Sequence, residues 1–389
     1  MLNLWRKAPV RRWGLRFNSG VASTTTTTTT TKPPLLSILP KKKVMNKLLF
    51  DNDSRFTYSK TIPILQAVYE NLDNPDEIVY PSKVNGQDLM VLKSVLTNVR
   101  TMTNTINKNL LGLENELVEQ AAEMGDNDAV ALLMYEVLCK SIREKDSVSD
   151  EDEKYASETL YDLIQLPNLL AIKLMGNFLF SINQFTQAKD VWKMYLKLDN
   201  DSIQAAQVYS SLGAYYMTYE QPTVNLGKAK ICFENAIRFG ILDDNLAKTH
   251  YYLGQLYSNV DPEIARYHWE ISATKSLVES FSALGFLELN TFQNYSKSVE
   301  WFKLGVETSK DVVCMIGLFD VYYRMKDNLQ AFTWLGKITA FNEKLKSYKK
   351  TPEYNNPEMK AYINNHEVQI EHFFKSRSNE INDVTSNVA

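Results

Sequence analysis

The chain has 389 residues, of which 44% are hydrophobic and 23% are charged. This balance supplies enough apolar material for a folded core and excludes a chain that is disordered throughout. The formal net charge of −3 hides an asymmetry, because residues 1–50 carry ten basic residues and no acidic one, which leaves a net charge of −13 on the remainder.

Residues 1–38 are predicted to be a mitochondrial presequence followed by a threonine-rich linker, both largely disordered. Val10, Trp13 and Phe17 fall on one face of a helix, while Arg12 and Arg16 fall together elsewhere, which is the amphipathic basic pattern of imported precursors. Cleavage is expected near Phe17. The eight consecutive threonines at 24–31 offer no apolar face to bury, which favours a linker. The alternative is a basic tail that binds nucleic acid or lipid.

Hydropathy and cysteine usage bear on the compartment. No apolar run approaches the ~20 residues that a membrane-spanning helix needs, so any membrane association is expected to be peripheral. The three cysteines, Cys139, Cys232 and Cys314, are odd in number and widely spaced, as expected for core residues in a reducing compartment. The mitochondrial matrix is therefore the preferred location.

An N-terminal helical region is predicted over residues 39–168. Helical periodicity runs over 86–140, and an acidic, solvated connection is expected at 144–154. Four lysines at the start of the region are candidates for a membrane-proximal basic site: Lys41, Lys42, Lys43 and Lys47. Basic residues near an anionic lipid surface contribute about 1 kcal/mol each. The alternative, given equal weight, is that these lysines only flank the first packed helix.

Residues 169–345 repeat a pattern of small residues that predicts consecutive helical hairpins. A large apolar residue followed by glycine marks the first helix of each unit: Met175-Gly176, Leu212-Gly213, Leu253-Gly254, Leu284-Gly285 and Ile316-Gly317. A small residue with an aromatic residue four positions later marks the second helix of the first four units: Ala188 with Trp192, Ala229 with Phe233, Ala265 with Trp269, and Ser298 with Phe302. The fifth unit, 313–340, keeps only part of the pattern.

These repeats are typical of an all-α protein, specifically an α-solenoid of degenerate tetratricopeptide or Sel1-like helical hairpins. In such hairpins the glycine lets the second helix approach the first closely, so the repeated residues are explained by packing alone. Residues 346–389 are predicted to form a C-terminal helix, at about 357–376, and a tail. The helix is expected to cap the last hydrophobic face.

No residue pattern indicates catalysis. His250, His268, His366 and His372 lack the spacing of a metal site, the glycines are not gathered in a phosphate-binding loop, and no nucleophile signature occurs. We therefore expect no enzyme activity, no metal and no cofactor.

One constellation does indicate binding. Tetratricopeptide domains of co-chaperones hold a partner's C-terminal carboxylate with five polar residues on three successive first helices. Counted from the glycines, Lys173, Asn177 and Lys248 match three of those positions, while Ser211 and Tyr252 replace the expected Asn and Arg. Two ammonium groups and an amide in one groove would bind a carboxylate through charge-assisted hydrogen bonds. The five residues are thus a candidate peptide-binding groove, although an insertion near 221–226 alters the repeat register.

Two segments are more specific than a generic repeat. Residues 39–50 read LPKKKVMNKLLF, and residues 283–290 read ALGFLELN, followed by EWFK at 300–303. Together they resemble a fungal family of mitochondrial factors, peripheral to the matrix side of the inner membrane, that are required to export the C-terminal tail of cytochrome c oxidase subunit 2. The similarity runs from about residue 39 to about residue 345. The threonine tract, the acidic segment and the tail depart from the family.

The resemblance implies an assembly factor for cytochrome c oxidase (complex IV) in the matrix, attached peripherally to the inner membrane. Its implied partners are subunit 2, an inner-membrane Oxa-type insertase, or both, with no nucleic acid and no small-molecule substrate. Two alternatives are a helical-repeat RNA-binding factor that supports mitochondrial translation and a general matrix co-chaperone. The net charge of −13 after residue 50 opposes RNA binding, because RNA phosphates require a basic surface.

Overall fold

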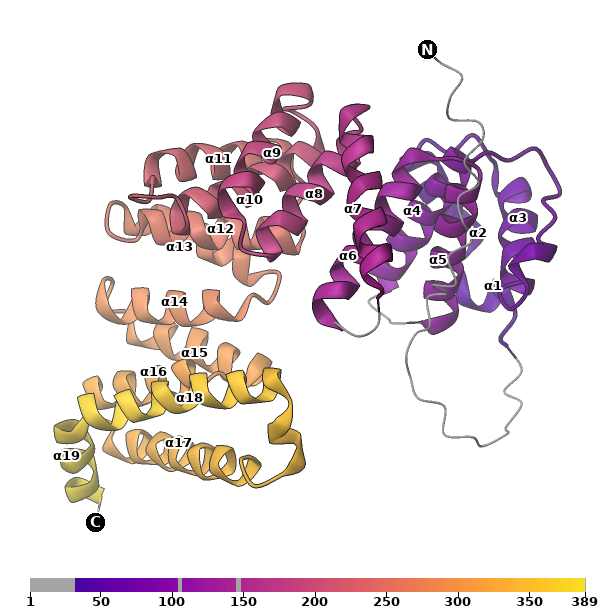
Figure 1. Ribbon diagram of the computed structural model, residues 1–389. Coiled ribbons are helices and arrows are strands. Elements are labelled where there is room, and N and C mark those ends of the chain that lie inside the picture. The colour runs from indigo at the N-terminus through magenta and orange to yellow at the C-terminus, as the bar shows by residue number, and fades with distance from the viewer. Residues whose placement is uncertain (1–31, 104–106, 145–147, 389) are drawn as a thin grey trace. The chain divides into compact units, whose positions relative to one another are not determined.

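A computed structural model describes residues 32–103, 107–144 and 148–388 (Figure 1). These residues form α-helices and two short 3-10 turns, and they contain no β-strand. The prediction of an all-α chain of helical hairpins is confirmed. The predicted presequence and most of the threonine-rich linker lie outside the described residues. The chain divides into two compact units, Met1–Leu198 and Asp199–Ala389, so the division falls within the predicted repeat segment.

The first unit contains nine α-helices among its described residues: α1 (Leu35–Ile38), α2 (Lys42–Asp51), α3 (Tyr58–Glu70), α4 (Gly86–Thr103), α5 (Lys108–Glu123), α6 (Asn127–Arg143), α7 (Asp150–Gln165), α8 (Leu169–Ser181) and α9 (Phe185–Leu198). The 3-10 turn Pro75–Glu77 lies between α3 and α4. Aliphatic side chains of α2 to α6 form one continuous core, in which Met45, Ile64, Leu89 and Leu117 are fully buried.

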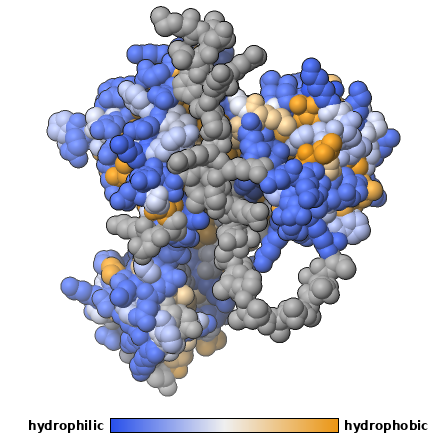
Figure 2. All heavy atoms as spheres, turned by 45° about the vertical axis from the view of Figure 1, so that its right-hand side comes forward, coloured by the Kyte–Doolittle hydropathy of each residue, from blue (hydrophilic) through white to orange (hydrophobic). Residues whose placement is uncertain are grey.

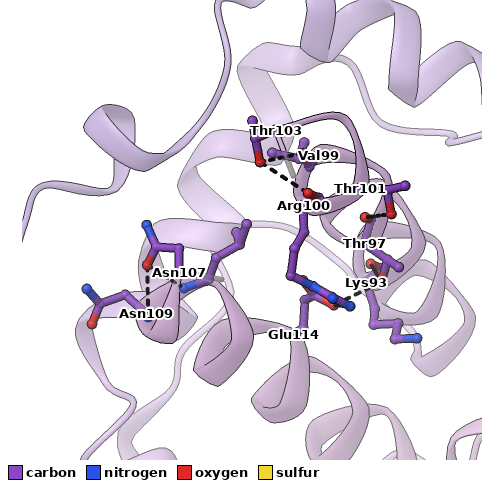
Figure 3. Close-up of polar contacts among 10 residues, drawn as sticks. Lys93, Thr97, Val99, Arg100, Thr101, Thr103, Asn107, Asn109 and Glu114 are labelled. Atoms are coloured by element: carbon purple, nitrogen blue, oxygen red, sulfur yellow. Dashed lines mark hydrogen bonds and ion pairs between the residues drawn. The ribbon is translucent and has the colours of Figure 1, made fainter. Parts of the chain in front are cut away.

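A buried carboxylate joins α4 to α5. Glu114, whose side chain is 3% exposed, accepts a hydrogen bond from Thr97 Oγ1 at 2.9 Å and pairs with Arg100 Nε at 3.1 Å. Figure 3 shows Arg100 and Thr97 on α4 directed at Glu114 on α5. Because a buried charge is costly unless it is paired and hydrogen-bonded, these contacts fix how the two helices pack.

The helical segment expected over 86–140 consists of three helices, α4, α5 and α6. Asn107 caps the start of α5, and its side-chain oxygen accepts from the backbone N–H of residues 109 and 110. Gly125 lies just after the end of α5, and its φ of +81° is a left-handed conformation that favours glycine. Asp126 caps α6 by accepting from the N–H of Ala129.

The expected acidic connection at 144–154 is helical from residue 150 onward. The helix α7 begins at Asp150, and the hydroxyl of Ser149 caps it by accepting from the N–H of Asp152 at 3.2 Å. All four acids, Asp150 to Glu153, therefore lie in the first turn. The N–H groups at the start of a helix and the helix dipole stabilise negative charge there. The four acidic residues therefore begin a helix and do not form a loop.

The second unit contains ten α-helices among its described residues: α10 (Ile203–Thr218), α11 (Leu226–Phe239), α12 (Asp244–Tyr257), α13 (Pro262–Ala273), α14 (Val278–Asn290), α15 (Tyr295–Ser309), α16 (Val312–Arg324), α17 (Asn328–Tyr348), α18 (Pro357–Ser376) and α19 (Ser378–Val388). Successive helices pair as hairpins, α10 with α11 through to α16 with α17. Figure 2 shows that the visible surface is mainly hydrophilic with separate hydrophobic patches.

The close approach predicted at the glycines occurs in each of the first four hairpins, where the glycine lies against an aromatic residue. An added methyl group would overlap the aromatic ring of the second helix in every case: Gly176 with Trp192, Gly213 with Phe233, Gly254 with Trp269, and Gly285 with Phe302. In the fifth hairpin, Gly317 lies against Phe302 of the preceding one. This explains why the fifth unit keeps only part of the pattern, since its glycine uses its neighbour's aromatic ring.

The C-terminal helix occurs where it was predicted. In α18 the ring of Phe373 packs edge-on against Phe319 of α16, with centroids 5.2 Å apart. Arg377, just after α18, donates from Nε to Asp320 of α16 at 3.0 Å. Ile363, Ile370 and Phe373 of α18 are buried, so the helix covers the last hairpin.

Candidate functional site

Two of the five predicted groove residues, Lys173 and Asn177, lie one turn apart on α8. Both side chains are half-buried. The side-chain oxygen Oδ1 of Asn177 accepts a hydrogen bond from the indole Nε1 of Trp192 at 3.3 Å. The amide therefore helps to hold α9 against α8, a structural role that counting from Gly176 did not reveal.

The other three residues lie on α10 and α12 of the second unit. The hydroxyl of Ser211 donates to the backbone carbonyl of Gln207 at 3.1 Å, so its proton is used within α10. Lys248 is exposed, and Tyr252 follows one turn later. The Tyr252 ring stacks on Phe233 with centroids 5.4 Å apart, and Phe233 in turn covers Gly213. The site residues thus divide between the two units, and the convergence of all five remains a prediction.

Within the second unit, α12 and the start of α14 form a local polar and aromatic surface. Gln255 donates from Nε2 to the hydroxyl of Tyr251 at 3.0 Å. Glu279 is exposed. Burial is the largest cause that raises the pKa of Tyr251, and the charge of Glu279 is the second. Burial also raises the pKa of Tyr252, followed by the influence of Tyr219 and then of Glu279. We call this surface the tyrosine face, and it consists of Lys248, Tyr251, Tyr252, Gln255 and Glu279.

Three residues of the tyrosine face were not among the predicted groove residues, although the repeat pattern contained the signal. Glu279 lies six residues before Gly285, as Lys248 lies six before Gly254. The face therefore presents an ammonium, a carboxylate and two phenol rings. Such a surface can pair with charges of both signs and cover apolar side chains, which suits an extended polypeptide better than an isolated carboxylate.

Two histidines that are 18 residues apart in the sequence meet between α12 and α13. Nδ1 of His250 lies 2.9 Å from Nδ1 of His268, and Tyr257 stacks on the His268 ring. Burial, and then the neighbouring His268, lowers the pKa of His250 to about 4, and burial lowers the pKa of His268. Their spacing in the sequence does not indicate this pair, because the two residues lie on different helices.

The predicted basic residues lie at the start of the first unit. Lys41 immediately precedes α2, and Lys42, Lys43 and Lys47 lie on it; all four are exposed. The ammonium of Lys42 lies 5.6 Å from the ring centre of Tyr58. Three of the four lysines therefore lie within the first sizeable packed helix, and all four face solvent.

No metal site is apparent in the described part of the chain, and two of its three cysteines are buried. No group of three or more His, Cys, Asp or Glu residues there could hold a metal ion. Cys232 and Cys314 are buried, and burial strongly raises the pKa of the Cys314 thiol, which keeps it protonated. No helix among the described residues has both the length and the apolar character needed to cross a membrane.

Comparison with known proteins gives both a family and relatives. A family model described as the MSS2 N-terminal domain matches residues 31–126. The protein "Protein MSS2, mitochondrial" of Saccharomyces cerevisiae is 32% identical over 289 residues, which cover 73% of this chain and 80% of that protein.

Two solved structures have a similar arrangement of helices. YrrB, described as a TPR protein with an unusual peptide-binding site, aligns with 46% of this chain and 89% of its own at 20% identity and a TM-score of 0.39. The Escherichia coli antigen c5321, described as having an SLR fold, aligns with 78% of this chain and 69% of its own at 14% identity and a TM-score of 0.45. The family assignment depends on the sequence match alone: at 32% identity over 73% of its length, this chain belongs to the mitochondrial MSS2 family.

Proposed function

We propose that this protein is an assembly factor for cytochrome c oxidase that binds polypeptide and promotes translocation of the C-terminal tail of subunit 2 across the inner membrane from the matrix side. The observation that supports this role most strongly is membership of the MSS2 family, over 73% of the chain. The resemblance to tail-export factors, noted from residues 39–50 and 283–305, gives the family match its functional content.

The step has a physical need for such a factor. A polar tail cannot enter hydrocarbon alone, because each backbone group without a hydrogen-bond partner would cost several kcal/mol there. A matrix-side protein that keeps the tail extended leaves it available to an Oxa-type insertase, which supplies the path. The role is one of binding, with no catalytic residue and no cofactor.

The tyrosine face is the surface that we assign to tail binding. Half-buried rings such as Tyr251 and Tyr252 lose little side-chain freedom on binding, since burial and the contacts with Gln255 and Phe233 already restrain them. Lys248 and Glu279 are exposed, and their opposite charges would select segments that carry complementary charges. Loose attachment to the inner membrane would keep this face close to the site of insertion.

Site-specific photocrosslinking tests the proposal directly. A benzoylphenylalanine placed at exposed Gln255, within the tyrosine face, is expected to crosslink newly made subunit 2 in mitochondria that translate their own genome. The matched control places the same group at exposed Glu270 on α13, outside the face, and is expected to give no such product. Crosslinks to RNA or to many imported proteins, without subunit 2, would favour the RNA-binding or general co-chaperone alternative and contradict the proposal.

A further inference from the structure

The helix α2 has two contrasting faces. Its inner face packs into the core of the first unit, where Met45, Leu48 and Leu49 are 0%, 6% and 3% exposed. Its outer face carries Lys42, Lys43, Asn46, Lys47 and Phe50, which recur at helical spacings of three and four residues and are all exposed. We call this outer surface the lysine–phenylalanine face.

Phe50 is the unusual residue of this face. Its side chain is 82% exposed, although two other large apolar residues in the same helix, Leu48 and Leu49, are buried. It lies one turn beyond Lys47 and two turns beyond Lys43, so a phenyl ring projects into solvent beside a row of ammonium groups. Folding does not require this ring, and its exposure leaves an apolar surface unused by the core.

The charge of the face is not neutralised within the described part of the chain. None of Lys41, Lys42, Lys43 and Lys47 has a carboxylate there within 4.0 Å, and the ammonium of Lys42 lies 5.6 Å from the centre of the Tyr58 ring. The sequence contains no acidic residue from position 1 to position 50, and the first acids, Asp51 and Asp53, follow the face. A helix with basic and apolar side chains on one exposed face fits a surface that is anionic outside and apolar beneath.

An anionic phospholipid surface has both properties. Headgroup phosphates can meet the ammonium groups, and the boundary with the acyl chains can accept the phenyl ring. RNA would use the lysines as well, but single-stranded RNA is held on several aromatic residues along a basic channel, and this face offers one ring. The combination therefore favours lipid.

We propose that α2 binds the surface of an anionic membrane, with Lys42, Lys43 and Lys47 at the phosphates and Phe50 at the acyl boundary. This binding site rests on the peripheral membrane attachment proposed above, and not on the role in tail export. It assigns the attachment to lipid and to a defined face of the first unit. The attachment is reversible, because a few lysines and one ring provide far less apolar burial than an inserted helix.

Binding to vesicles tests the proposal with the processed protein purified from mitochondria. The vesicles consist of phosphatidylcholine alone or mixed with phosphatidylglycerol. Binding is expected only to the anionic vesicles and is expected to weaken as salt is added, since salt screens exposed charges. Replacing Lys42, Lys43 and Lys47 with Gln should lower the partition coefficient on the order of a hundredfold, at about fivefold per lysine. Phe50→Ser should lower it roughly tenfold, the lower end for burial of a phenyl ring.

Matched variants separate this face from general effects of charge and exposure. Lys275, Lys297 and Lys303, all exposed in the second unit, give the same change of charge when replaced by Gln. Val79, whose side chain is 79% exposed, is the control for Phe50 when replaced by Ser. Both control variants should bind as the unaltered protein does, and all variants should unfold at unchanged temperatures, because every replaced side chain is exposed.

Two outcomes would overturn the proposal. One is anionic-vesicle binding that survives both the triple lysine change and Phe50→Ser. The other is RNA binding that depends on the same lysines, with no effect of Phe50→Ser on vesicles. Since the assay contains no subunit 2, its failure would leave the proposed tail export standing, and a failure of tail export would leave lipid binding standing.

Discussion

Phe302 shows how single residues determine the spacing of these helices. Its ring is fully buried and lies against Gly285 in its own hairpin and Gly317 in the next. Both glycines face the ring at distances that leave no room for a side chain. One aromatic residue thus joins two hairpins, which is why small residues recur at these positions.

Replacing Gly285 with Ala should therefore destabilise the second unit. The added methyl group overlaps the Phe302 ring, and neither α14 nor α15 can move without disturbing the buried residues around them, at a cost of about 2 kcal/mol. The matched control is Gly336→Ala in α17, where an added methyl meets no atom within 4 Å. Because alanine favours a helix over glycine, the control should stabilise by up to about 1 kcal/mol. Urea unfolding of both variants measures the difference, and equal stabilities would contradict this packing.

The offset between each glycine and its aromatic partner made these contacts predictable from the sequence. The partner of Asn177 was not predictable, because the indole of Trp192 reaches it only once α8 and α9 have paired. The same holds for Phe50: helical periodicity places it on the outer face of α2, but its 82% exposure became evident only when the neighbouring helices were placed.

At the scale of helices, α12 and α13 meet through a pair of histidines that should make the second unit sensitive to acid. His250 is 5% exposed, and its pKa falls from an ordinary value of 6.5 to about 4. The groups around the pair are Tyr257 of α12, Tyr267 of α13 and the carboxylate of Glu234, which raises the pKa of His268 slightly against burial.

A depressed histidine pKa means that the unfolded chain binds a proton more readily than the folded one. The stability that the neutral pair provides is therefore complete above pH 6.5 and decreases as the pH falls from about 6.5 toward about 4. The free energy of unfolding, measured across this pH range, should depend less on pH in His250→Gln than in the unaltered protein. His372→Gln, at an exposed position, should leave that dependence unchanged. An identical slope in the unaltered protein and in His250→Gln would exclude the pair as its source.

The C-terminal helix begins at Pro357, and the side chain of Asn356 caps it by accepting a hydrogen bond from the N–H of Glu358 at 2.8 Å. Periodicity alone joined α4, α5 and α6, since their apolar positions continue across the breaks. The acidic run at 150–153 was misread because its composition suits both a solvated connection and a first helical turn.

At the scale of the whole molecule, the excess of basic residues and the helical repeats lie in different parts of the chain. Residues 1–50 contain ten basic residues, and residues 51–389 carry a net charge of −13. The proposed lipid contact lies at the basic end of the described residues, and the proposed polypeptide contact lies on the tyrosine face of the second unit. The family could be predicted from the sequence, because it depends on the order of residues. The division of the candidate groove between two units could not be predicted, because the repeats look alike on both sides of residue 198.

The central claim is that this protein promotes export of the C-terminal tail of subunit 2. The most direct test is the accessibility of that tail to added protease in mitoplasts from cells with and without the protein. The account predicts that the N-terminal segment of subunit 2 is cleaved in both, and that the C-terminal tail is protected only when the protein is missing. A tail that is cleaved equally in both would contradict the claim.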